Sequence, residues 1–156
     1  MINFRSGGLG TIRPRTSGAD DSELRKFEGE FGYRIPNTYR HFLATVNGGT
    51  FTDPFPISLP AGSFSDATSL FTLYSLDSKN PRSGADVREV LRLHATRIPT
   101  GSLPIGDDGD NLLLIHCIPN RAGHISLWVR EDEWDKAPEE NSVPVADSFE
   151  SCFGLS

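Results

Sequence analysis

Cysteines and long hydrophobic runs are both scarce in this sequence of 156 residues. Two cysteines, Cys117 and Cys152, cannot build a disulfide framework, so we expect both to be reduced thiols, with Cys117 buried in an apolar strand. No apolar run approaches the ~20 residues that a helix needs to span a bilayer. The N-terminal residues also lack the apolar stretch of a secretory signal peptide. These absences argue against disulfide-rich secreted proteins and against membrane association, and they favour the cytoplasm.

Motifs for catalysis, cofactor binding and metal binding are missing as well. The sequence has no P-loop, no dinucleotide-binding fingerprint, no Gly-x-Ser-x-Gly elbow and neither of the common zinc spacings. Residues 107–110 resemble the start of a calcium loop, but Leu112 occupies a ligand position and no closing glutamate follows. A catalytic triad assembled from distant residues stays open, since triads are defined by geometry. We therefore expect no metal, no cofactor and no enzyme, and an enzyme acting on a small polar ligand is the weakest hypothesis.

Four histidines are the remaining candidates for such chemistry. His116 and His124 lie on two neighbouring predicted strands and could approach each other, whereas His41 adjoins an apolar helix face and His94 ends a charged segment. None of them has the spacing of a zinc motif. We therefore expect structural or exposed histidines.

Charge is distributed unevenly along the chain. The net charge is −6, but residues 1–99 carry +2 and residues 100–156 carry −8. An acidic C-terminal part argues against nucleic-acid binding, which needs lysine and arginine against phosphate. It suits a basic protein partner, because complementary fields speed encounter, although many soluble proteins are modestly acidic without any such partner.

Hydrophobic periodicity and turn residues predict a single α+β domain. Residues 1–19 are interpreted as a loose arm or short edge segment before a domain over 20–156, and residues 61–69 as a loop. We expect helices over 20–31, 36–46, 86–93 and 147–150, and strands over 50–60, 70–74, 102–105, 111–118, 124–130 and 143–145. The strand over 111–118 would be the longest, and the short turn after it favours an antiparallel hairpin. The expected architecture is a mostly antiparallel sheet with helices packed on one face.

Two sequence blocks are more specific than these patterns. In the first, Ile35-Pro36 begins a helix whose apolar face carries Tyr39, Phe42 and Leu43, and Asn47-Gly48-Gly49 ends it. The second is Leu103-Pro104-Ile105-Gly106-Asp107-Asp108-Gly109, followed by the apolar run 112–118. Together with Phe31-Gly32, these blocks resemble the SUKH superfamily, in the branch that groups a yeast cell-wall synthesis regulator with many bacterial immunity proteins. Asp110 stands where that family commonly has glycine.

The resemblance covers roughly residues 20–153 and implies a SUKH-like fold and a binding function. It implies an immunity protein that neutralises a polymorphic bacterial toxin, often a nuclease or another nucleic-acid-modifying domain, by stoichiometric binding. The alternative that it implies is a non-catalytic scaffold or regulatory module that binds endogenous proteins. A basic toxin domain is therefore the expected partner.

Two acidic segments are the candidate partner-binding sites. The first surrounds a tryptophan just beyond a predicted strand end, where flanking carboxylates could steer a basic partner to an aromatic anchor. The alternative is that this tryptophan covers the edge of the core while the acidic residues form an ordinary solvated rim. The second segment is the turn after the strand over 102–105. The candidate residues are Glu131, Asp132, Glu133, Trp134 and Asp135 in the first segment, and Asp107, Asp108 and Asp110 in the second.

Overall fold

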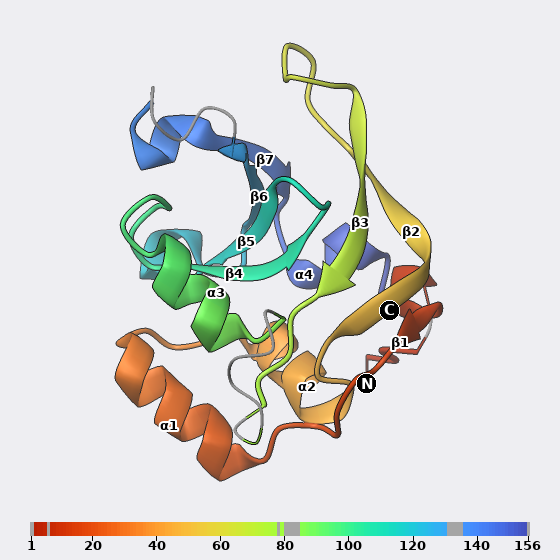
Figure 1. The fold of residues 1–156 in the computed structure, drawn as a ribbon, viewed down its shortest axis with the longest axis vertical. Helices are drawn as coiled ribbons and strands as arrows, with labels where there is room; N and C mark the ends of the chain where they lie inside the picture. The colour runs from red at the N-terminus through yellow and green to blue at the C-terminus, as the bar shows by residue number, and fades with distance from the viewer. Residues whose placement is uncertain (1, 6, 78, 80–84, 131–135, 156) are drawn as a thin grey trace.

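A single antiparallel sheet organises the protein (Figure 1). The structure is a computed structural model that describes residues 2–5, 7–77, 79, 85–130 and 136–155. Among these residues, seven strands follow one another across the sheet in chain order, and all neighbours are antiparallel. They are β1 (Ile12–Arg13), β2 (Gly49–Ser58), β3 (Ala67–Leu73), β4 (Ser102–Asp107), β5 (Leu112–His116), β6 (Ile125–Trp128) and β7 (Ser142–Ala146).

Four α-helices accompany the sheet in the described part of the chain. They are α1 (Asp21–Phe31), α2 (Asn37–Thr45), α3 (Val87–His94) and α4 (Phe149–Phe153), with short 3-10 turns η1 (Gly7–Leu9), η2 (Pro119–Arg121) and η4 (Pro138–Asn141). Side chains of Asp20, Asp86 and Ser148 accept hydrogen bonds from the first-turn N–H groups of α1, α3 and α4. No helix within the described ranges is long and apolar enough to cross a membrane. The α+β class and the four predicted helices are confirmed.

The lengths of the strands differ from the prediction. The longest described strand is β2, with 10 residues, whereas β5 has only 5. The predicted loop over 61–69 is wrong at its end, because β3 begins at Ala67 and pairs with Ser58. Ala67, Thr68 and Ser69 lack the hydrophobic pattern that predicts a strand. They belong to β3 because they pair with β2. The pairing of β2 with β3 also shifts register between Thr50 and Phe55.

An aromatic cluster joins two helices to the sheet. The ring of Phe149 on α4 lies 5.5 Å from Tyr39 and 5.2 Å from Phe42, both on α2. Phe153, one turn further along α4, lies 5.2 Å from Phe55 on β2. Aromatic pairs at these separations add to the free energy gained by burying their surface. The short final helix therefore acts as a link between α2 and β2.

The residues Asn47-Gly48-Gly49 join three parts of the backbone. Asn47 adopts φ 62°, and its buried amide donates to the carbonyls of Ser17 and Leu76 and accepts from the Leu76 N–H. A Cβ on Gly48 would lie 2.5 Å from the Tyr74 carbonyl oxygen, and one on Gly49 would lie 2.2 Å from that of Arg13. Only glycine permits such close approaches at positive φ. The motif thus fixes the segment after β3, which carries Tyr74.

The described part of the N-terminal segment, residues 2–5 and 7–19, is attached to the body of the protein. Phe4, Leu9 and Ile12 are buried in the same core as the helices, and β1 pairs with the start of β2. Of the two interpretations that the sequence allowed, the short edge segment is the one observed.

Candidate functional site

The acidic turn between β4 and β5 is held by its own carboxylates. Asp108 Oδ1 accepts from the backbone N–H groups of Asn111 at 2.6 Å and Asp110 at 3.0 Å, and Oδ2 accepts from the Thr68 hydroxyl at 2.6 Å. Partial burial raises the pKa of Asp108, but the hydrogen bonds from Thr68, Asn111 and Asp110 lower it more, so its pKa lies below the usual value. Asp108 is therefore an ionised group that stabilises the turn.

Asp107 has a comparable structural role. Its Oδ1 accepts from the Gly109 N–H at 3.0 Å, and its Oδ2 accepts from the Tyr74 hydroxyl at 2.6 Å. Burial and this hydrogen bond raise the pKa of Tyr74 above its usual value, so the phenol stays protonated and donates. The Arg15 guanidinium, which interacts electrostatically with Asp107, donates to Thr50 Oγ1 and the Leu73 carbonyl oxygen. The turn is thereby tied to β2 and β3.

Large apolar side chains are exposed beside this acidic turn. Leu93 on α3 is 61% exposed and Phe71 on β3 is 45% exposed. Leu93 shares a pocket of about 200 Å³ with Asp107 and Asp110, and the Phe71 ring lies next to Gly109. Asp110 is exposed at the tip of the turn. We call the surface formed by Phe71, Leu93, Asp107, Asp108 and Asp110 the acidic turn face.

The structure describes only one of the two predicted partner-binding segments. Asp107, Asp108 and Asp110 lie together in one turn, but Asp107 and Asp108 are engaged in internal hydrogen bonds, which the sequence did not reveal. Glu131, Asp132, Glu133, Trp134 and Asp135 lie outside the described residues, so their part in binding stays a prediction. Arg130, the residue before them, lines the pocket that contains Asp107 and Asp110. The sequence did not predict that Leu93 and Phe71 would be exposed, since apolar residues in a predicted helix or strand are expected in the core.

His116 and the two cysteines occupy structural positions. His116 and His124 do approach each other, because the His116 N–H donates to the His124 carbonyl oxygen, and His116 Nε2 lies 2.8 Å from Ser126 Oγ. Burial, with smaller effects from Arg121 and His124, lowers the pKa of His116 to about 4.

Cys117 and Cys152 are free thiols, and burial raises the pKa of each to about 12, which makes them poor nucleophiles. Within the described ranges, no three His, Cys, Asp or Glu residues form a group that could hold a metal ion.

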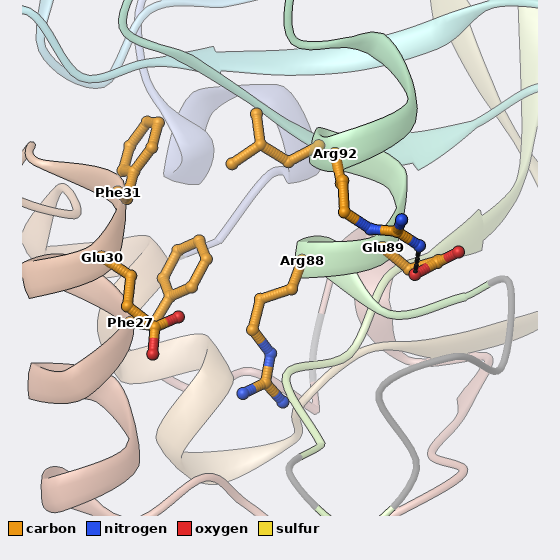
Figure 2. Close-up of a pocket in the computed structure, with 7 residues that line it drawn as sticks. Phe27, Glu30, Phe31, Arg88, Glu89 and Arg92 are labelled. Carbon is orange, nitrogen blue, oxygen red and sulfur yellow. Dashed lines mark hydrogen bonds and ion pairs between the residues drawn. The ribbon is translucent and has the colours of Figure 1, made fainter.

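A second recess lies between α1 and α3 (Figure 2). We call it the α1–α3 groove. Phe27 and Phe31 line it from α1, and Leu91 lines it from α3. Figure 2 shows the charged ends of Glu30 and Arg88 on the same side of the groove, coming from opposite walls. Phe27 and Phe31 are four residues apart, so the sequence places them on one face of a helix, but it gives no sign that residues about sixty positions further along the chain face them.

These observations define a class: a small α+β domain whose antiparallel sheet and helices surround one core, with an acidic turn and an apolar groove at the surface. The chain belongs to the SMI1 / KNR4 family (SUKH-1), whose sequence model matches residues 18–154. This confirms the resemblance seen in the sequence. The fold is similar to that of a solved structure described as a protein from Pseudomonas syringae pv. tomato, with a TM-score of 0.50, 19% identity and 79% of each chain covered. The comparison with curated proteins finds no match.

Proposed function

We propose that this protein is a cytoplasmic immunity protein that binds and neutralises a polymorphic bacterial toxin. The family to which the chain belongs supports a non-catalytic role, because its members are generally immunity or regulatory proteins. Neutralisation would be stoichiometric: the protein covers the active or substrate-binding surface of the toxin for as long as the complex lasts.

The observation that carries this proposal is the pairing of exposed apolar side chains with acidic ones on the acidic turn face. Scattered surface leucines are ordinary, but here Leu93 and Phe71 both lie beside the turn that carries Asp110. An interface needs apolar anchors for affinity and polar neighbours for orientation, and this face has both. It is therefore the surface on which we place the toxin.

A basic toxin domain fits the charge of this face. Residues 100–156 carry −8, and the turn contributes three carboxylates to that total. Domains that act on nucleic acids are commonly basic because they hold phosphate groups. An acidic immunity protein would be attracted to the phosphate-binding surface of such a domain and would exclude the nucleic-acid substrate from it.

An affinity pull-down from the native cells, washed at low and high salt, tests the proposal. We expect one basic toxin domain in near-stoichiometric amount, with retention that falls as salt rises because screening weakens exposed charge pairs. Recovery of signalling or cell-wall proteins in its place would support a regulatory scaffold. An empty eluate calls for the same measurement with recombinant toxin domains, and failure of every basic domain to bind would contradict the proposal.

A further inference from the structure

The α1–α3 groove combines an apolar floor with two opposite charges that are not paired with each other. Among the described residues, no hydrogen bond or ion pair is formed by the Glu30 carboxylate, and Arg88 Nη2 is buried without a hydrogen-bond partner. The remaining contact of the Arg88 guanidinium is Nε with the buried Asp86 carboxylate, at 3.4 Å. By contrast, Arg92 on the same helix pairs with its neighbour Glu89. A buried guanidinium N–H without an acceptor costs free energy. Because the Arg88 side chain lines the groove and is 22% exposed, a ligand carboxylate that draws the guanidinium toward it would recover that cost.

The size of the groove limits what it can hold. Its volume is about 340 Å³, whereas a cavity of about 150 Å³ suffices for a benzene ring. Phe27 and Phe31 are one turn apart, which is only about 6 Å along the axis of α1. A docked amphipathic helix is anchored over two turns or more, at i, i+3/i+4 and i+7. The groove therefore suits a ligand with one large apolar group better than a helix.

We propose that the α1–α3 groove binds a small zwitterion with an apolar side chain, the chemical class of the hydrophobic α-amino acids. The apolar side chain lies between Phe27, Phe31 and Leu91. The ligand carboxylate accepts from Arg88, and its ammonium group pairs with Glu30. Such a site is separate from the acidic turn face, and it stands whether or not the protein binds a toxin.

Nuclear magnetic resonance titration with four matched probes tests this assignment. L-Phenylalanine carries both charges, 3-phenylpropionate lacks the ammonium group, 2-phenylethylamine lacks the carboxylate, and L-alanine lacks the large side chain. We expect millimolar L-phenylalanine to shift the backbone amide signals of residues 27–31 and 88–92. Either probe with a single charge should bind about tenfold more weakly, since one charge-assisted hydrogen bond is lost. L-Alanine should leave these signals unchanged.

Variants assign each charge to its wall of the groove. Glu30→Gln should weaken L-phenylalanine about tenfold without weakening 3-phenylpropionate, whereas Arg88→Met should weaken both. Arg25→Met is the matched control, because it removes an equal charge from α1 at an exposed guanidinium that is already paired with Asp21 and does not line the groove. It should leave the affinities nearly unchanged. Because Glu30 is exposed, Glu30→Gln keeps the test valid even if Arg88→Met fails to fold.

Three results would overturn the proposal. The first is the absence of any shift of the groove signals with L-phenylalanine at millimolar concentration. The proposal also fails if an amphipathic helical peptide shifts these signals and L-phenylalanine does not. The second is equal binding of all three aromatic probes, which would make the groove merely apolar. The third is an equal effect of Arg88→Met and Arg25→Met, which would indicate general electrostatics. None of these results bears on toxin binding at the acidic turn face.

Discussion

At the scale of single residues, Asn47 shows how one side chain can hold distant segments together. Replacing it with alanine removes three hydrogen bonds and leaves the Leu76 N–H and carbonyl groups without these partners. It also places a less tolerant residue at φ 62°. We expect Asn47→Ala to lower the free energy of unfolding by about 3 kcal/mol in urea denaturation. Asn120→Ala, at an exposed site, should change it little, and equal effects would contradict this role.

His116 makes stability depend on pH. Its pKa is about 4 in the folded protein, below the value of about 6.5 expected when unfolded, so the unfolded state binds a proton first as pH falls. Stability should therefore decrease from about pH 6.5 to pH 4, by about 2–3 kcal/mol from this group. Urea unfolding across this range should show the decrease in the wild type and lose most of it in His116→Gln.

His41 provides the control for this pH dependence. It is exposed on α2, so His41→Gln should retain the decrease. If His116→Gln keeps the wild-type slope, the depressed pKa of His116 is contradicted.

At the scale of secondary-structure elements, the N-caps of α1 and α3 have different importance. Asp86 is fully buried and accepts from the backbone N–H groups of Asp77 and Arg88 as well as from the Arg88 side chain. Asp20, which caps α1, is exposed. We expect Asp86→Ala to cost about 3 kcal/mol, since it leaves the Arg88 charge uncompensated in a largely buried position.

Asp20→Ala tests the same kind of cap without the burial. Its loss of stability in urea denaturation should be clearly smaller than that of Asp86→Ala, because water can replace the hydrogen bonds of an exposed cap. A loss as large as that of Asp86→Ala would show that burial is not what distinguishes the two caps.

Elements that carry their own signals were predictable from the sequence. The helix from Asn37 to Thr45 follows a proline and is followed by Asn47-Gly48-Gly49, and β5 and β6 are close enough in the chain to pair as a hairpin. The start of β3 was not predictable, because Ala67 and Thr68 become a strand by pairing with β2. Such pairing is a tertiary interaction, which local propensity does not encode.

At the scale of the whole molecule, the candidate site was predictable only in part. The acidic turn was found because aspartates and glycine cluster in sequence. The exposure of Leu93 and the proximity of Phe71 depend on how α3 and β3 pack beside the turn. The α1–α3 groove likewise joins residues that are distant in the chain. Sequence patterns identify which residues are apolar, but only packing decides which of them remain at the surface.

The acidic turn face should control association with the toxin in two separable ways. Leu93→Ala should speed dissociation, because an apolar anchor is lost, and we expect roughly tenfold weaker binding. Asp110→Asn, or neutral replacements of Glu131, Asp132, Glu133 and Asp135, should slow association, mainly at low salt. Stopped-flow kinetics with the identified toxin would measure both rates.

Glu139→Gln supplies the control for loss of charge outside the acidic turn face. It removes an exposed carboxylate on η4 and should change the association rate less than Asp110→Asn does. If the association rates of all these variants match the wild type, the toxin does not bind through this face.

The most direct test of the central claim is protection of cells that express the toxin domain recovered with this protein. Co-expression of the wild-type chain should restore growth, and purified protein should abolish toxin activity at a one-to-one ratio. Leu93→Ala combined with Asp110→Asn should protect less at equal expression and with an unchanged free energy of unfolding. Tight binding without protection, and without loss of toxin activity, would contradict an immunity function and favour a regulatory role.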